Sequence, residues 1–176
     1  TQNPVDQEGT YPLSEAQTDR FMIKEILGYP SAEQEVEVMF RMDAGLYDRE
    51  HRARPVVTLD DVRRAQHVVR NVHMDQALML YAGRLVGATR NPEQFLPAQL
   101  ARLVEYGASP RATIALCQTA RALAVLSGRA HVVPDDIAKL AHRVLRHRLI
   151  LGFEAASKGI TSERIIEAVL QAIRVP

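Results

Sequence analysis

The sequence has little of what secreted, membrane-spanning or zinc-binding proteins require. Among its 176 residues there is one cysteine, Cys117, so it can build neither a disulfide framework nor a zinc cluster based on cysteine. No apolar run approaches the roughly 18 residues of a membrane span, and no signal peptide is visible. We therefore expect no membrane span, and the lone thiol fits a reducing compartment, which predicts a cytoplasmic location.

Common catalytic patterns are also missing from the sequence. There is no Ser–His–Asp pattern, no metal-ligand spacing and no glycine-rich phosphate loop of the G-x-x-x-x-G-K-[ST] type. His142 and His147 stand beside arginines at a spacing unsuited to a metal, which indicates a solvated face. A formal net charge of +1 argues against a generally basic nucleic-acid binder. We predict no metal ligands in this chain and no nucleic-acid partner.

The sequence does contain a series of helix signals. Its composition, with 47% apolar and 24% charged residues, is ordinary for a soluble globular protein. Caps, acidic first turns and helical periodicity predict a mainly α-helical chain. The expected elements are a helical turn at 13–19, a buried strand at Phe21–Leu27, and helices at 31–44, 58–71, 75–89, 109–128, 134–148 and 161–173. The segment 91–107 is undecided, with a short helix possible at 98–106.

The most distinctive stretch is Gly107-Ala108-Ser109-Pro110-Arg111-Ala112, which opens the most apolar helix. Ser109 is a favourable N-cap, and Pro110 suits the first helical position. Arg111 is unexpected because a cation in the first turn faces the positive end of the helix dipole. It either completes an anion site suited to phosphate or forms a salt bridge with a neighbouring carboxylate.

Two other polar residues could act on a phosphoryl group. Asn3 lies in Thr1-Gln2-Asn3-Pro4, and an asparagine amide can orient a water molecule. Arg20 lies directly before the predicted strand, and arginines neutralise charge on a transferred phosphoryl group. Each of these signals is weak when taken alone.

Taken together and in this order, these motifs resemble the second half of a MoxR-type AAA+ ATPase, within the group that includes the magnesium-chelatase ATPase subunit. The resemblance covers essentially the whole chain. It is carried by Thr1-Gln2-Asn3-Pro4, Glu8 to Phe21, Gly28-Tyr29-Pro30-Ser31, the Gly107–Ala112 motif, Val132 to Asp136 and Val144 to Leu149. Ser14 stands where many relatives have proline, a departure that we expect to be harmless.

The resemblance implies a role for each of the three polar residues. Asn3 would be the sensor 1 residue that holds the attacking water near the γ-phosphate. Arg20, in the Asp-Arg-Phe box, would be the arginine finger that reaches a neighbouring subunit's nucleotide. Arg111 would be the sensor 2 residue that contacts the γ-phosphate from the lid. Tyr29 and Pro30 would form the hinge between core and lid.

The resemblance also implies two domains. Residues 1–30 would be the end of an α/β P-loop core, represented by its last strand and loop, and residues 31–176 would be a helical lid. The phosphate loop and the acidic Walker B strand would precede Thr1, so we expect the chain to be a portion of a longer protein and to be inactive alone. The resemblance implies that the intact protein uses ATP and Mg²⁺, forms a hexameric ring, and remodels protein clients such as von Willebrand factor A domain proteins.

An alternative from another class stays open. The chain could be a stand-alone helical interaction module that binds an acidic partner or nucleic acid through the cluster Arg143–Arg148. The same cations are, however, equally favourable simply because they lie at the C-terminus of a helix. Strong salt dependence of binding would distinguish this alternative.

Overall fold

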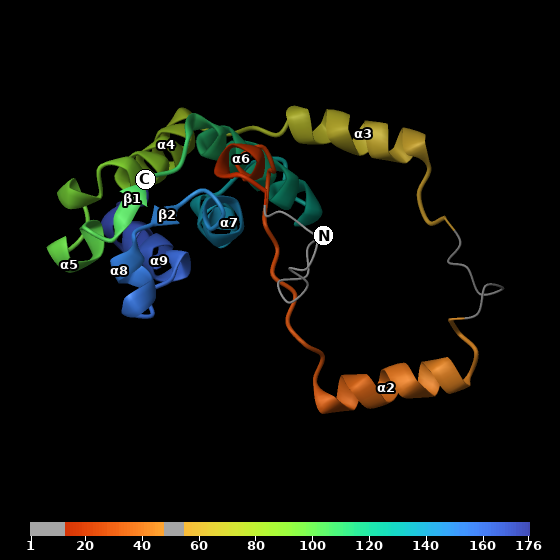
Figure 1. The fold of residues 1–176 in the computed structure, drawn as a ribbon. Helices are drawn as coiled ribbons and strands as arrows, with labels where there is room; N and C mark the ends of the chain where they lie inside the picture. The colour runs from red at the N-terminus through yellow and green to blue at the C-terminus, as the bar shows by residue number, and fades with distance from the viewer. Residues whose placement is uncertain (1–12, 48–54) are drawn as a thin grey trace. The chain divides into compact units, whose positions relative to one another are not determined.

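The computed structural model describes residues 13–47 and 55–176, and within them the predicted mainly helical class is confirmed (Figure 1). Asn3 lies outside the described residues. The helices are α1 (Glu15–Thr18), α2 (Ala32–Asp43), α3 (Leu59–Arg70), α4 (Gln76–Arg90), the 3₁₀ helix η2 (Pro92–Gln94), α5 (Ala98–Ala101), α6 (Pro110–Leu126), α7 (Pro134–Leu145), α8 (Phe153–Ser157) and α9 (Ser162–Ala172), and the strands are β1 (Val104–Tyr106) and β2 (Ile150–Leu151).

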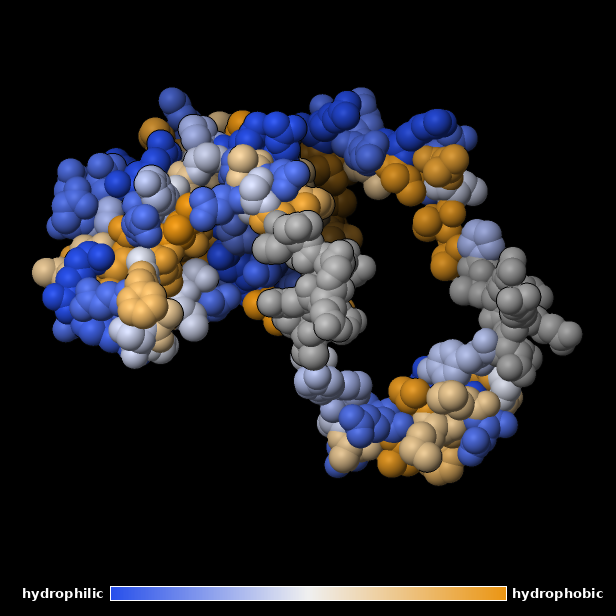
Figure 2. Space-filling model, in the orientation of Figure 1, coloured by the Kyte–Doolittle hydropathy of each residue, from blue (hydrophilic) through white to orange (hydrophobic). Residues whose placement is uncertain are grey.

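The chain divides into two compact units. The first combines the segment that ends at Lys24 with Val68–Pro176, and the second is Glu25–His67. In the second unit, no described residue of α2 or α3 is buried. Apolar side chains are exposed along α2, among them Met39 at 64% and Phe40 at 65%, and Figure 2 shows this apolar surface in orange. The helices of the second unit are therefore held by local signals, such as the capping box at Ser31, rather than by a buried core of their own.

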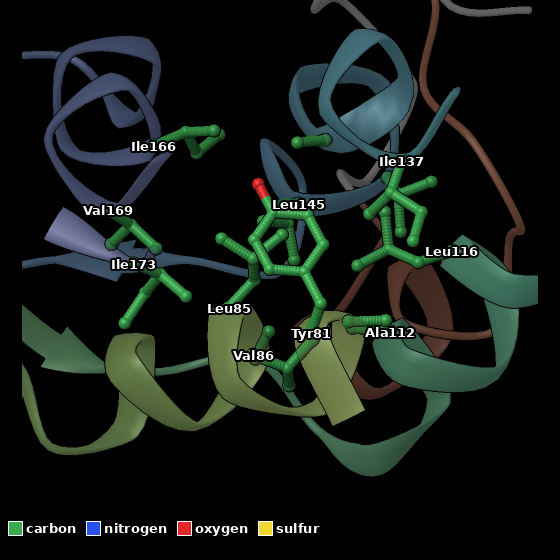
Figure 3. Packing of buried hydrophobic residues seen from close by; sticks show 14 of the residues in the cluster. Tyr81, Leu85, Val86, Ala112, Leu116, Ile137, Leu145, Ile166, Val169 and Ile173 are labelled. Carbon is green, nitrogen blue, oxygen red and sulfur yellow. The ribbon is translucent and has the colours of Figure 1, made fainter. Parts of the chain in front are cut away.

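The core of the first unit lies between α4, α6, α7 and α9 (Figure 3). Each helix contributes large side chains that are fully buried, including Leu85 from α4, Leu116 from α6, Leu145 from α7 and Ile166 from α9. Burying each such side chain contributes roughly 1.5–3 kcal/mol to folding. The core therefore holds α6 and α7 in place, and the charged residues considered below lie in or next to these helices.

The predicted start and end of α6 are confirmed. The Ser109 hydroxyl accepts a hydrogen bond from the backbone N–H of Arg111 at 3.2 Å, and Pro110 is the first helical residue. The helix ends before Gly128, whose φ of 71° is the left-handed conformation that glycine adopts without strain. The helices predicted to start at residues 75 and 161 also begin there. The Asp75 side chain caps α4 by accepting from the Ala77 N–H, whereas Thr161 precedes α9 without a side-chain capping bond.

The segment 98–106 differs from its prediction. Only Ala98–Ala101 is helical, and Val104–Tyr106 forms β1, which pairs antiparallel with β2. The helix prediction is wrong beyond Ala101 because β2, nearly fifty residues later, supplies backbone partners that local sequence does not reveal. Neither β2 nor α8 was predicted.

The predicted strand at Phe21–Leu27 is wrong. The segment is extended but pairs with no strand among the described residues, and Phe21 is 56% exposed. An isolated strand cannot satisfy its backbone groups, so it is stable only inside a sheet. Here the backbone groups of residues 21–24 instead bond to the C-terminal end of α7, as described below.

Candidate functional site

The short helix α1 directly precedes Asp19 and Arg20 and helps to position them near the start of α6. Ser14 and Gln17 form a capping box in which the Ser14 N–H donates to Gln17 Oε1 at 2.9 Å. The helix has only four residues, so the cap fixes where the following residues emerge. In Figure 1, α1 is the red helix that lies beside α6.

Asp19 is the centre of the site because three side chains donate hydrogen bonds to its carboxylate. The Ser109 hydroxyl lies 2.9 Å from each carboxylate oxygen, Arg111 Nη1 lies 3.1 Å from Oδ2, and Arg148 Nε lies 3.1 Å from Oδ1. Burial alone would raise the pKa of Asp19, but these hydrogen bonds outweigh it and hold the pKa below its usual value. Asp19 is therefore a stable anion at the N-terminus of α6.

Arg148 is the buried partner of Asp19. Its side chain is only 2% exposed, and burial lowers the pKa of its guanidinium, which the charge of Asp19 partly offsets. Its terminal nitrogens also donate to backbone carbonyls on both sides of the site, namely those of Asp19 (3.1 Å), Phe21 (2.6 Å), Met22 (3.2 Å) and Val144. A single guanidinium thus holds residues 19–22 against α7.

Two further contacts extend this attachment. His147 Nε2 lies 3.0 Å from the carbonyl oxygen of Phe21, and the Lys24 N–H donates to the carbonyl of Arg143 at 2.8 Å. Burial lowers the pKa of His147, so its ring is predominantly neutral and Nε2 carries the proton that it donates to Phe21. The solvated-face interpretation of His147 is therefore wrong, since the ring packs between α7 and the extended segment.

The predicted site residues have different environments. Arg20 is exposed, and its side chain forms no hydrogen bond or ion pair with other residues of the described part of the chain. Arg111 pairs with Asp19, as the salt-bridge alternative predicted, yet its side chain remains 56% exposed. Tyr29 and Pro30 lie in an extended exposed stretch of the second unit. Arg111 thus contacts Asp19, the residue that directly precedes Arg20 in the sequence.

The cluster Arg143–Arg148 is less available for an outside partner than the sequence indicated. Arg148 is buried against Asp19, and Arg146 is 14% exposed and pairs with Glu163 at 3.2 Å. Arg143 is exposed. No group of acidic, histidine and cysteine residues suited to a metal ion occurs in the described ranges, and none of their helices is long and apolar enough to cross a membrane.

Sequence reasoning missed the loop support beneath Ser109. Thr89 is fully buried at the end of α4, where its hydroxyl donates to the Val86 carbonyl at 2.7 Å and accepts from the Ala108 N–H at 3.0 Å. A Cβ on Gly107 would lie 2.3 Å from the backbone oxygen of Thr89, so only glycine permits this approach. The signal was present in the sequence as a glycine two residues before the N-cap.

Two family models match the chain. The model described as AAA lid domain matches residues 99–169, and the model described as ATPase family associated with various cellular activities (AAA) matches residues 1–23. The first includes Arg111 and Arg148, and the second includes Asp19 and Arg20. Both sides of the Asp19 cluster thus fall in matched segments.

Similar proteins match along the full chain. It is 41% identical over all of its length to Chaperone MoxR1 of Mycobacterium tuberculosis, covering 46% of that protein, and 30% identical to Protein MoxR of Paracoccus denitrificans, covering 54% of it. A crystal structure of a candidate ATPase from Cytophaga hutchinsonii superposes with a TM-score of 0.91 at 40% identity, with 99% of this chain and 52% of that chain covered. The chain spans about half the length of the curated relatives it matches. On these matches, the chain is similar along its whole length to MoxR-type AAA+ proteins, and its residues 99–169 match the AAA lid domain.

Proposed function

We propose that this chain supplies the nucleotide-sensing elements of a MoxR-type AAA+ ATPase that couples ATP hydrolysis to the remodelling or maturation of partner proteins. The observation that carries the proposal is that Asp19, whose carboxylate pairs with the exposed Arg111, directly precedes the exposed Arg20. The relative from Mycobacterium tuberculosis is named a chaperone, which supports a protein client.

In this proposal Arg111 is the sensor 2 residue and exchanges partners. Without nucleotide it pairs with Asp19, and with ATP bound it turns to the γ-phosphate. The exchange is feasible because Arg111 is more than half exposed and because Arg148 remains on Asp19 when Arg111 leaves. Asp19 would therefore not be left as an unpaired partly buried charge, which would be costly.

Arg20 is the arginine finger in this proposal, and Asn3 is the sensor 1 residue. An arginine finger must reach outward to another subunit's nucleotide, and the side chain of Arg20, exposed and without a partner among residues 13–47 and 55–176, is suited to that role. The intact protein would form a ring, which we propose to be hexameric, with ATP and Mg²⁺ bound by residues outside this chain. Its proposed clients include von Willebrand factor A domain proteins, and its proposed location is the cytoplasm.

The domain assignment follows the same proposal. Residues 1–30 would complete an α/β core, residues 31–176 would form the lid, and Tyr29 and Pro30 would serve as the hinge. The exposed and extended backbone around Tyr29 supports the hinge because little packing would have to change there. The chain by itself would not hydrolyse ATP because it contains no phosphate-loop lysine.

The test compares three arginine variants in the longer protein. We expect Arg20→Ala and Arg111→Ala each to reduce ATP turnover by about 10³-fold, the scale of an arginine finger. Arg84→Ala, which removes another exposed arginine from α4, is the matched control and should leave turnover unchanged. Near-normal turnover in both test variants would overturn the assignment of these residues.

A further inference from the structure

We propose that Asp19 and Arg148 are positioning residues that fasten the candidate arginine finger, Arg20, to the lid, so that Arg20 and Arg111 move as one body. This inference rests on the proposed function for the roles of Arg20 and Arg111. The coupling itself is a property of the described residues and can be tested separately. It assigns a task to Asp19 and Arg148 that neither phosphate contact nor helix capping explains.

The first support is the number of bonds that converge on a few residues. Arg148 bonds to the carboxylate and carbonyl of Asp19 and to the carbonyls of Phe21 and Met22, which lie 126 to 129 residues away in sequence. Arg20 lies between Asp19 and Phe21, so its Cα is fixed from both sides. Its side chain alone remains exposed.

The second support is that the same carboxylate reaches the start of α6. Ser109 and Arg111 both donate to Asp19, and the backbone N–H of Arg111 donates to Ser109. Ser109 is in turn held by the loop that Gly107 packs on Thr89. An unbroken series of buried or half-buried contacts thus connects the lid core to the base of Arg20.

The third support is the division of the chain. Contacts group the segment that ends at Lys24 with Val68–Pro176, although 43 intervening residues, Glu25–His67, form a separate unit. The Asp-Arg-Phe box is therefore attached to the lid helices directly and not through the chain that follows it. A motion at the proposed hinge, Tyr29 and Pro30, would therefore displace the second unit and would not separate Arg20 from Arg111.

The structural test measures the distance between α1 and the lid in the longer protein. Spin labels are placed at Glu15→Cys and Gln118→Cys, both exposed, in a background that replaces Cys117 and any other native cysteine. Without nucleotide, with ADP and with a non-hydrolysable ATP analogue, we expect one narrow distance distribution that does not shift. Asp19→Asn and Arg148→Lys should each broaden it. A distance that changes with nucleotide, or that stays narrow in both variants, would overturn the inference.

The functional test separates positioning from general stability. Arg148→Lys keeps the charge but loses the forked geometry, and Asp19→Asn keeps the shape but loses the charge. We expect each to lower kcat about tenfold or more with little change in the KM for ATP, because small misplacements of an aligned group are costly. Asp136→Asn is the matched control: it weakens another buried carboxylate–arginine pair, with Arg129, and should leave kcat and the label distance unchanged.

The two tests can fail independently. If the longer protein hydrolyses no ATP, the proposed function fails, and the label distances still decide whether the box and the lid are one body. If turnover is normal in Asp19→Asn and Arg148→Lys while Arg20→Ala abolishes it, the finger is confirmed and the positioning role is wrong. Two substitutions at the junction guard against a single variant that does not fold.

Discussion

Two carboxylate–arginine pairs in this chain have nearly the same chemistry but different consequences. Asp136 pairs with Arg129, seven residues before it, through two hydrogen bonds of 2.6 and 2.8 Å, and also accepts from the Val133 N–H. Asp19 pairs with Arg148 across 129 residues. In both cases, burial would raise the carboxylate pKa, and hydrogen bonds hold it below its usual value.

The difference lies in what each pair joins. The Asp136 pair closes the first turn of α7 on its own preceding loop, so it strengthens one helix. The Asp19 pair joins a segment with no regular structure, residues 21–24, to the lid core. The comparison teaches that a buried ion pair of ordinary geometry becomes a candidate functional element when it is the main attachment of the segment it holds. Each prediction below is designed to break one pair and spare the other.

The largest effect is expected from removal of the buried guanidinium. We expect Arg148→Met to lower the free energy of unfolding by about 3–5 kcal/mol, because it removes the main partner of Asp19 and leaves backbone carbonyls without donors. Arg129→Met should cost less, since Arg129 is 28% exposed and Asp136 retains the Val133 N–H. Urea unfolding of both variants measures the difference. Equal losses would show that the long-range pair contributes no more than the local one.

A smaller effect is expected from Gly107→Ala. The added Cβ would lie 2.3 Å from the Thr89 carbonyl oxygen, so the loop must shift and move Ser109 from Asp19. We expect a loss of about 1–3 kcal/mol. Hydrogen exchange should increase at the Arg111 and Lys24 amides but not at the Val133 amide, which reports on the Asp136 pair. Gly83→Ala, on α4 where a Cβ meets nothing, is the control. Faster exchange at Val133 as well would mean that the loop supports both pairs.

The sequence predicted those parts of the fold that depend on neighbouring residues. The start of α6 at Ser109-Pro110, its end at Gly128 and the cap of α4 at Asp75 all follow from local signals, and the structure confirms them. Arg111 was recognised as unusual for the same local reason. The two alternatives for it, an anion site and a salt bridge, could not be separated because the carboxylate partner is remote in sequence.

What the sequence could not predict depends on remote partners. Phe21–Leu27 has the composition of a strand, but the strand prediction failed because those backbone groups meet Arg148 and His147 rather than another strand. From the sequence, Arg148 was grouped with the exposed cations at a helix C-terminus, where the helix dipole stabilises any positive charge even without a carboxylate partner. Only the packed structure distinguishes a solvated arginine from one that is 2% exposed.

The smallest expected effect is a pH dependence caused by His147. This histidine lies next to the Asp19–Arg148 pair and not next to the Asp136–Arg129 pair. Burial lowers its pKa below the ordinary value of about 6.5, Nε2 donates to Phe21, and Nδ1 is buried without a partner among the described residues. The charges of Arg148 and Lys24 further disfavour protonation, while that of Asp19 favours it. Because the folded state binds the proton less well than the unfolded state, its stability is complete above about pH 6.5 and falls as the pH drops toward the lowered pKa.

Asp19 and Asp136 stay ionised at pH 5 because their pKa values are held low, so both carboxylate–arginine pairs keep their charges in a comparison of pH 7.5 with pH 5. We expect faster exchange at the Lys24 amide at pH 5, after correction for the intrinsic pH dependence, and no change at Val133. His147→Gln, which can still donate to Phe21, should remove this difference. His142→Gln is the matched control, since His142 lies 3.6 Å from Glu167 and contacts neither Asp19 nor Phe21 in the described residues. A pH effect that persists in His147→Gln and disappears in His142→Gln would place the sensitivity at the contact between α7 and α9, and the junction around Asp19 would then be insensitive to pH.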